Sequence, residues 1–426
     1  MDETDSPARR DPISMKKLLQ GDCSWAIQKL ILGWIVDTVA KTLSLPPHKV
    51  ERLQEILNSL PATKKRISIR KWHKVLGELR SMSLALPGSR GLFSELQLAL
   101  QQKKKGRVNL QKGLHGILDD FRYLLKDISN RPTRIAELIP LAPSLQNYHD
   151  ASGTMAGGVL LPSAHAIHRH PSKAPVIWRC FFPTSIQKEL VTDKNPNGSI
   201  TNSDLELMAA VISNDAAAQN FNVQERTILS HTDNSPTMYW LRKGSTTSNS
   251  ARAHLLRAQA LHQRFHRYVA QIDFIPGVEN SISDLPSRSA HLTDNELLHF
   301  FDSHFPQPRS WRLWTPPQKL LSALTSCLHR KTFNMESLLQ EPRKCPATGP
   351  IGAPSAPSSY PSIPIYQLSK TLLPSFKSLQ RDFGTVVYPT SGDQFAQEQL
   401  RMPYGRLDKR SAIWGPRTLA PTCKAK

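Results

Sequence analysis

Cysteine is scarce in this sequence, and apolar residues never form a long run. The five cysteines (Cys23, Cys180, Cys327, Cys345 and Cys423) show neither CxxC nor zinc-finger spacing. Their odd number and wide separation argue against a disulfide framework and favour a reducing compartment. No stretch approaches the roughly 18 apolar residues of a membrane span. The polar start MDETDSPARRDP lacks the apolar core of a signal peptide. We therefore expect an intracellular protein, cytoplasmic or nuclear, with no membrane partner.

Acidic side chains are also few, because 34 Asp and Glu stand against 55 Lys and Arg. The net charge of +21 on 426 residues is too large for solubility tuning alone and indicates a polyanionic partner, such as a nucleic acid. Hydrophobic residues make up 39% of the chain, which is enough for the cores of ordinary domains. A wholly disordered chain is therefore excluded.

The first part of the chain reads as a polar leader, residues 1–29, followed by a helical region, residues 30–140. Apolar residues recur at helical spacing in Val50–Leu60 and Trp72–Met82. The apolar stretch Ala26–Val39 is interrupted by polar residues and predicts a buried core segment. Residues 291–330 predict a helical extension. Residues 331–426, with the run TGPIGAPSAPSSYPSIP, predict a Pro/Ser-rich linker and a largely disordered tail.

Positive charge is concentrated between Lys64 and Arg134, where 17 Lys and Arg face five Asp and Glu. Runs such as KKRISIRK could follow a sugar-phosphate backbone by charge alone. Solvated helix faces are the alternative interpretation. The candidate nucleic-acid contacts in this region are Lys64, Lys65, Arg66, Arg70 and Lys71.

Residues 141–290 change to a different pattern. Three apolar runs, LQNYHDAS, AGGVLLP and APVIWRCFF, are separated by Gly, Pro and Ser clusters and predict a meander of strands. A helix over Ser203–Phe221, the strand RTILSH, the helices PTMYWLRK and ARAHLLRAQALHQRFHR, and the strand YVAQIDFIP follow. This succession predicts an α/β fold with a mixed sheet flanked by helices.

Four carboxylates fall at strand ends and helix starts of this sheet. Asp150 ends the first strand, Glu206 lies near the start of the next helix, Asp233 ends a strand, and Asp284 follows the last strand. If they converge on one edge, divalent cations would offset their mutual repulsion. Each also has a structural alternative: a capping box for Glu206, helix caps for Asp233 and Asp284, and an Asx turn for Asp150. Four independent caps explain the set less well than one site.

Four motifs, HDASGTMAGGVLLP, SDLELMAA, SHTDNSPTMYW and NSISDLPSR, occur in this order over roughly Leu141–Ser289. Together they resemble the ribonuclease H domain of retrotransposon reverse transcriptases. The upstream runs LILGWIVDT and WHKVLGELRSMSLALPGSRGLFSELQLAL are similar to the end of the palm, the thumb and the connection of the same polyproteins. The overall likeness is strongest to DIRS-type and gypsy-like elements.

The resemblance implies a ribonuclease H-like sheet and an enzyme that hydrolyses the RNA strand of RNA/DNA hybrids with two Mg²⁺ or Mn²⁺ ions. Asp150 would bridge both ions, Glu206 and Asp233 would bind one of them, and Asp284 would bind the other. Other retroelement proteins are candidate partners, and the oligomeric state stays open. The fingers and most of the palm have no counterpart, and no Tyr-x-Asp-Asp pair occurs, so DNA polymerase activity is not expected.

Further contacts to sugar and phosphate are expected near this centre. The candidates are Ser152, Asn234, Arg252, Arg257, Arg264 and Arg267, with a solvated helix face as the rival interpretation for the arginines. His254, His262 and His266 share a face of the same helix, and their spacing favours a polar surface over a metal site. The HAIHRH run, residues 165–170, is also not predicted to bind metal.

Two other functions remain open at this stage. One is a non-catalytic nucleic-acid-binding remnant of a retroelement, in which the basic region is the main functional surface. The other is a scaffold module that pairs with a separate polymerase chain. An exposed apolar face on Leu30–Leu60 would distinguish the scaffold from the enzyme.

Overall fold

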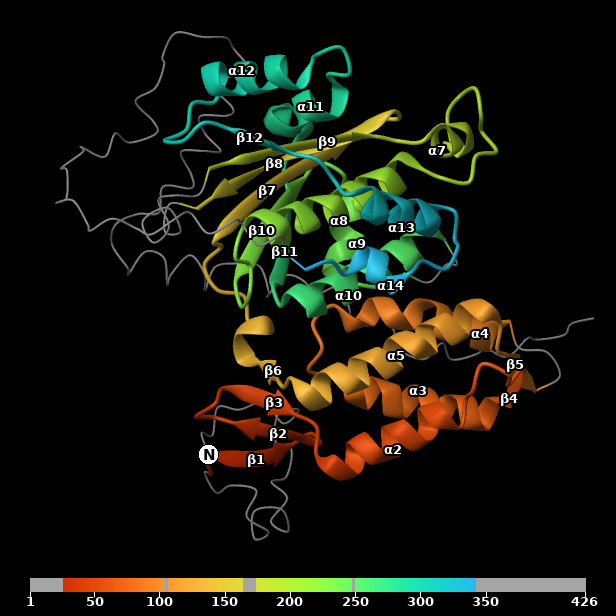
Figure 1. Cartoon of the computed structure of the whole chain (residues 1–426). Helices are drawn as coiled ribbons and strands as arrows, with labels where there is room; N and C mark the ends of the chain where they lie inside the picture. Colours follow the sequence, from red (N-terminus) through yellow and green to blue (C-terminus); the bar gives the residue numbers. More distant parts are fainter. Residues whose placement is uncertain (1–25, 103–105, 164–173, 247–249, 342–426) are drawn as a thin grey trace, which may run out of the picture. The chain divides into compact units, whose positions relative to one another are not determined.

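The protein is described from a computed structural model that places residues 26–102, 106–163, 174–246 and 250–341 (Figure 1). All of these residues belong to one compact unit, Met1–Ile351. The HAIHRH run and most of the predicted tail lie outside the described residues. Within the described residues, no helix is long and apolar enough to cross a membrane.

The core of this unit is a six-stranded sheet with the order β11-β10-β7-β8-β9-β12. The meander β7 (Leu145–Ala151), β8 (Met155–Pro162) and β9 (Val176–Phe181) is antiparallel. Strands β10 (Thr227–Thr232) and β11 (Val269–Phe274) continue it in parallel with β7. The short β12 (Arg312–Trp314) lies parallel to β9. The predicted mixed α/β sheet is confirmed, because the apolar runs separated by turn residues form its strands.

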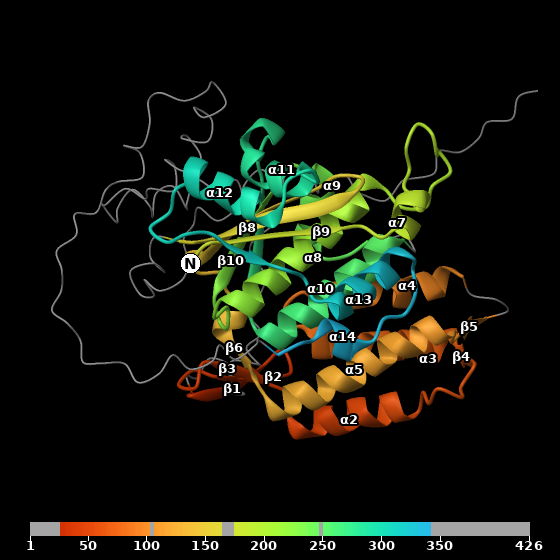
Figure 2. The same cartoon turned by 45° about the horizontal axis from the view of Figure 1, so that its top comes forward.

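Helices cover both faces of this sheet. Helix α8 (Asn202–Asn220) lies on one face with α10 (Ala251–His266) beyond it, and α11 (Ser281–Arg288) lies on the other face (Figures 1 and 2). The Trp178 indole donates a hydrogen bond of 2.9 Å to Ser213 Oγ, which ties β9 to α8. The three predicted helices correspond to α8, α9 (Ser235–Lys243) and α10, and α7 (Thr184–Glu189) is an additional short helix.

In its described residues, the N-terminal part of the unit contains four α-helices and two small sheets. The helices are α2 (Pro47–Asn58), α3 (Ile69–Ser83), α4 (Ser94–Gln101) and α5 (Lys112–Asn130). Strands β4 (Arg66–Ser68) and β5 (Arg107–Asn109) form a hairpin. The other sheet has the order β1-β2-β3-β6, with β1 (Gln28–Ile31), β2 (Trp34–Asp37), β3 (Thr42–Ser44) and β6 (Thr133–Arg134).

The prediction of a buried core segment at Ala26–Val39 is wrong. Strands β1 and β2 are antiparallel, and Leu32 and Gly33 reverse the chain between them with φ values of 51° and 78°. Of the apolar side chains, Leu30 is 59% exposed, Leu32 82% and Val39 72%. A hairpin can bury one of its two faces, and here only Trp34, which is 3% exposed, belongs to the core. The run as a whole is therefore not a buried core segment.

The predicted helical extension contains an additional strand. Helix α12 (Asp294–His304) and helix α13 (Gln318–Leu328) are helical as expected, but β12 lies between them and adds to the sheet. Helix α14 (Met335–Leu338) falls in the range predicted as linker, and its Leu338 is fully buried. The packed part of the chain therefore extends beyond Arg330.

Gly157 controls how closely α11 approaches the sheet. This residue pairs with Asp150 across β7 and β8. A Cβ atom at Gly157 would lie 2.4 Å from the carbonyl carbon of Pro286 and 2.6 Å from the backbone nitrogen of Ser287. Both atoms belong to helix backbone, so they cannot rotate away as a flexible side chain would. The absence of a side chain at Gly157 thus positions α11 directly beside Asp150.

We predict that Gly157→Ala destabilises the protein by about 1–3 kcal/mol, because α11 must move off the sheet. Gly77→Ala is the matched control, since Gly77 is exposed in α3 and a Cβ atom there meets nothing within 4 Å. That control should gain up to about 1 kcal/mol from helix propensity. Urea denaturation of both variants measures the difference, and equal stabilities would contradict the role of Gly157.

Candidate active site

Three of the four predicted carboxylates come together at one end of the sheet. Asp150 is the penultimate residue of β7, Glu206 lies in the second turn of α8, and Asp233 directly follows β10. One carboxylate oxygen of each lies within 4.8 Å of the others. Asp150 is 1% exposed and Glu206 is 2% exposed, whereas Asp233 is half-buried. Residues far apart in the sequence thus form one buried acidic cluster.

Helix capping, the structural alternative for Glu206 and Asp233, does not explain these two acids. The capping box of α8 is formed by Thr201 and Asp204, whose Oδ2 accepts from the Thr201 backbone nitrogen at 2.9 Å. Glu206 takes no part in this cap. At α9 the cap is Asn234, whose Oδ1 accepts from the Thr237 backbone nitrogen at 3.0 Å, so Asp233 is not the cap. Neither residue of the cluster is therefore explained by helix termination.

Asp284 lies on α11 and is linked to the cluster through Arg288. The Arg288 guanidinium is 3.1 Å from Asp284 Oδ1 and 3.5 Å from Asp150 Oδ2. Ser287, on the same helix, donates a hydrogen bond to Asp150 Oδ2. Asp284 is not one of the three acids that lie within 4.8 Å of one another, and its side chain is 37% exposed. Besides burial, the negative charges of Asp150 and Asp233 nevertheless raise the pKa of Asp284.

Burial and like charge raise the pKa values of these carboxyl groups. Burial is the main cause for Glu206, whose pKa lies well above its usual value, and the neighbouring Asp150 raises it further. The pKa values of Asp233 and Asp284 are raised by burial first and by Asp150 second, and Arg288 partly opposes both shifts. A site with these properties binds either protons or another positive charge.

The donor atoms of the cluster fit hard divalent cations. Among the described residues, Glu206 Oε2 is buried and has no hydrogen-bond partner. An unpaired buried carboxylate oxygen costs several kcal/mol, which a bound cation would remove. Mg²⁺ and Mn²⁺ prefer oxygen ligands and use few carboxylates per ion, leaving positions for water and phosphate. The cluster offers only oxygen ligands and therefore matches these ions.

Three of the arginines predicted to contact nucleic acid are used inside the protein instead. Arg257 is 3% exposed and forms a buried ion pair with Asp120 of α5. Arg264 is 1% exposed and pairs with Asp127 at 2.6 Å and with Glu137 at 3.2 Å. Their guanidinium groups neutralise buried carboxylates, so they are not available to phosphate. The prediction is wrong for Arg257 and Arg264.

Arg267 is also committed to internal ion pairs. It ends α10 with a φ of 61° and pairs with Glu137 at 3.0 Å and with Glu225 at 2.7 Å. These contacts contradict a role for Arg267 in nucleic-acid binding. The expected polar surface of His254, His262 and His266 is wrong as well, since all three side chains are buried. A face of α10 that appears polar in the sequence is covered by α8 and by the N-terminal helices.

The other candidates near the acids have local structural contacts. Ser152 Oγ donates to the Met155 carbonyl at 3.0 Å and holds the turn between β7 and β8. Asn234 caps α9, as described above. Arg252 stacks on the Trp240 ring, 4.3 Å from its centroid, and lies 3.7 Å from Asp204. Their side chains remain partly accessible, so a contact to substrate stays a prediction for these three residues.

The basic residues of the N-terminal part are at the surface. Lys65 and Arg66 lie at the β4 strand, and Arg70 and Lys71 lie in the first turn of α3; all four are exposed. Lys64 is half-buried and donates to the Ser59 carbonyl at 2.8 Å. No ion pair within the described part of the chain uses these five side chains. We call these five residues the basic patch.

Sequence reasoning missed the residues of α11 that support the acids. Arg288 and Ser287 both lie in the motif NSISDLPSR, and the Asp284–Arg288 pair has the i,i+4 spacing of facing helix residues. Asn280, at the start of α11, lowers the pKa of Asp233 by a hydrogen bond. The helical spacing was a usable signal for Arg288, but only the fold places Ser287 against Asp150.

Comparison with known proteins adds little to this geometry. No protein-family profile matches the chain, and no curated protein matches it. Three solved structures of the foamy viral protease-reverse transcriptase are similar to it over part of its length. With the form named dRH bound to double-stranded DNA, the identity is 9% and the TM-score 0.23, covering 58% of this chain and 38% of that one.

The other two matches are of the same kind. With the complex containing an RNA/DNA hybrid, the identity is 12% and the TM-score 0.23, covering 63% of this chain and 31% of that one. With a further double-stranded DNA complex, the identity is 11% and the TM-score 0.24, covering 69% and 45%. The chain thus spans less than half of each viral chain. At these TM-scores the matches establish neither the fold nor the function, which rest on the geometry above.

The raised pKa values predict how stability depends on pH without metal. Between about pH 4.5 and their folded pKa values, these acids keep protons in the folded protein that the unfolded chain has lost. The free energy of unfolding therefore falls as pH rises through their folded pKa values. A divalent cation favours the ionised acids. We therefore expect Mg²⁺ to raise the melting temperature at pH 8 and to have little effect at pH 5.

Glu206→Gln isolates the contribution of Glu206 to the pH-dependent stabilisation by Mg²⁺, because Gln cannot ionise. Buried His149 and His231, with pKa values lowered to about 4 by burial, act in the opposite sense below about pH 6.5. The measured quantity is therefore the difference in melting temperature between wild type and variant at each pH, with and without Mg²⁺. A Mg²⁺ effect of the same size in Glu206→Gln would mean that the ion binds elsewhere.

Proposed function

We propose that this protein is a metal-dependent endonuclease that hydrolyses the RNA strand of RNA/DNA hybrids, as part of a truncated reverse transcriptase derived from a retroelement. The observation that carries the proposal is the buried cluster of Asp150, Glu206 and Asp233, in which Glu206 Oε2 lacks any hydrogen-bond partner among the described residues. Three of the four motifs that resemble ribonuclease H supply these acids in this order, and the fourth supplies Asp284. DNA synthesis is not part of the proposal.

Different residues of the chain would bind the metal ions, orient the acids and balance their charge. Asp150, Glu206, Asp233 and Asp284 would hold two divalent cations, with Asp150 placed centrally because it influences each of the other three acids. When bound, such cations supply Lewis-acid stabilisation of a phosphate and lower the pKa of water. Ser287 fixes the Asp150 carboxylate by its hydrogen bond. Arg288 carries the positive charge that partly balances the acids when substrate phosphate is absent.

The basic patch would hold the nucleic acid by its phosphates. Arg70 and Lys71 stand in the first turn of α3, a turn without any acidic residue. The positive end of the helix dipole disfavours cations at this place, and a bound phosphate would relieve the repulsion. Contacts of this kind carry no base information, so the cleavage should tolerate any sequence and depend on the shape of the hybrid.

The proposal predicts that Asp150→Asn abolishes cleavage of a labelled RNA/DNA hybrid in Mg²⁺ or Mn²⁺. Binding of the hybrid should stay equal or become tighter, because one negative charge near the phosphates is lost. Asp193→Asn, in the exposed loop after α7, is the matched control and should cleave as wild type does. EDTA should stop cleavage by the wild type.

The outcomes separate the site from the substrate. If folded Asp150→Asn loses binding and cleavage together, Asp150 is not a metal ligand of a catalytic centre. If the wild type cuts only double-stranded RNA or DNA, the proposed metal centre is supported, but the proposed specificity for RNA/DNA hybrids is wrong. Tight binding of the hybrid without any cutting by the folded wild type would favour a non-catalytic nucleic-acid-binding remnant.

A second prediction concerns the basic patch. Replacing its five residues with Ala should weaken hybrid binding for all sequences and reduce the slope of log affinity against log salt, because fewer counterions are released on binding. The matched control removes five exposed cations elsewhere: Lys188, Lys194, Arg312, Lys319 and Lys331. A salt slope that changes equally in both variants would show that the patch is only solvated surface.

A second candidate function follows from the β1–β2 hairpin. Its exposed apolar residues are the feature that the scaffold alternative requires, with Leu30 59% and Leu32 82% exposed. Exposed apolar groups of this kind are typical of surfaces that bind another protein. A scaffold module that pairs with a separate polymerase chain is compatible with the acidic cluster, and it becomes the main function if the folded wild type neither cuts nor binds the hybrid.

A further inference from the structure

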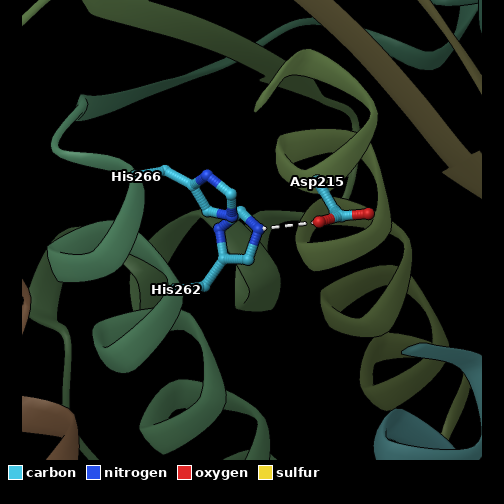
Figure 3. A group of neighbouring side chains, drawn as sticks. All are labelled: Asp215, His262 and His266. Atoms are coloured by element: carbon cyan, nitrogen blue, oxygen red, sulfur yellow. Dashed lines mark hydrogen bonds and ion pairs between the residues drawn. The ribbon is translucent and has the colours of Figure 1, made fainter. Parts of the chain in front are cut away.

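A second cluster of metal-ligating side chains lies between α8 and α10, at the other end of α8 from Glu206. It consists of Asp215 on α8 and of His262 and His266 on α10 (Figure 3). One ligand atom of each residue lies within 4.8 Å of the others. Their exposed fractions are 2%, 0% and 8%, so the cluster is buried. Asp215 stands nine positions after Glu206, roughly 13 Å along the helix axis.

The geometry of this cluster is close to that of a three-ligand zinc site. His262 and His266 have the i,i+4 spacing that places two side chains on one helix face. The His262 Nε2 atom is 3.1 Å from Asp215 Oδ1. Ligand atoms around a tetrahedral Zn²⁺ with bonds of about 2.0–2.1 Å are separated by roughly 3.3 Å. One nitrogen of His266 lies within 4.8 Å of the other two ligand atoms, so this side chain would have to move closer to complete the triangle.

His266 is the residue that a purely structural interpretation leaves unexplained. Within the described residues, its Nε2 atom is buried and has no hydrogen-bond partner. Its ring centroid lies 4.3 Å from that of His262. A buried imidazole nitrogen without a hydrogen-bond partner can offer its lone pair to a metal ion.

The surroundings of His262 also suit a metal ligand. Its Nδ1 atom lies 3.0 Å from the Tyr268 hydroxyl, which accepts a hydrogen bond of 2.9 Å from Gln259 Nε2. Because the hydroxyl can accept from the Nδ1–H group, Nε2 could bind a metal ion in place of the proton that it shares with Asp215. Hydrogen bonds of this kind orient metal-binding histidines and fix their tautomer.

We propose that Asp215, His262 and His266 form a structural binding site for Zn²⁺ or a similar late transition-metal ion, separate from the acidic cluster. Two imidazoles and one carboxylate match Zn²⁺ better than Mg²⁺, which prefers oxygen ligands alone. The ion would join α8 to α10 and supply the missing partner of His266 Nε2. Since the side chains are buried, the ion would enter during folding or local opening.

The test measures zinc bound to the full chain. Protein dialysed against micromolar Zn²⁺ with millimolar Mg²⁺, which occupies the oxygen sites, should retain about one zinc per chain by mass spectrometry. His266→Gln and Asp215→Asn should retain none. His254→Gln is the matched control, because His254 is a buried histidine of the same helix outside the cluster, and it should retain zinc as wild type does.

Two further variants keep the result decisive if a cluster variant fails to fold. Tyr268→Phe removes only the group that orients His262 and should weaken zinc binding by about tenfold or more without changing the stoichiometry. Asp150→Asn should keep the zinc, since the acidic cluster is a different site. The proposal is overturned if wild-type protein binds no zinc, if folded His266→Gln binds it as tightly as wild type, or if Asp150→Asn loses it.

Discussion

Helix α8 has almost no side chain in solvent, and this constraint places both metal-ligating clusters. The sheet covers one side of the helix, and α10 and α13 pack against it from the other side (Figure 1). Buried residues therefore occur on every face of α8, including the acids Asp204, Glu206 and Asp215. A buried carboxylate requires a partner. Asp204 caps the helix and Asp215 meets His262, whereas Glu206 faces two further acids, Asp150 and Asp233, and would need a cation to offset their charge.

The positive charge of the chain divides into two populations with different roles. Arg257 and Arg264 lie in the interior and form ion pairs with Asp120, Asp127 and Glu137. Removing one partner of such a pair typically costs 3–5 kcal/mol, because the other charge is left buried and unpaired. These arginines therefore hold α10 to α5 and contribute nothing to a nucleic-acid surface. The charge that can attract a polyanion is at the exterior, as in the basic patch.

Much of the central sheet could be predicted from the sequence, because its strands are continuous apolar runs bounded by Gly, Pro and Ser. The meander β7–β9 and the helix α8 follow these signals closely. The four acids could be predicted as a set, since each stands where an element of that sheet begins or ends. Whether they converge depends on the strand order, which periodicity does not contain.

The failures have a common physical cause, which is that local patterns do not show what covers a surface. LILGWIVDT has the composition of a core segment, but Leu32–Gly33 turn the chain and expose one face of the hairpin. The histidines of α10 have the spacing of a polar stripe, but α8 and the N-terminal helices cover them. The strand β12 has only three residues, too few for a periodic signal, and pairs with β9 through tertiary contacts.

The two clusters on α8 differ in the donor atoms that the fold assembles, and this difference suits them to different ions. At the first cluster, strand ends and helix starts contribute only carboxylate oxygens, which suit hard cations that keep water and phosphate as further ligands. At the second, α10 contributes two imidazoles beside one carboxylate, in a place without access for substrate. Burial makes an exchanging ion unsuitable there and favours a permanently held one. The same helix can therefore carry a site suited to catalysis and a site suited to stability without competition for one metal.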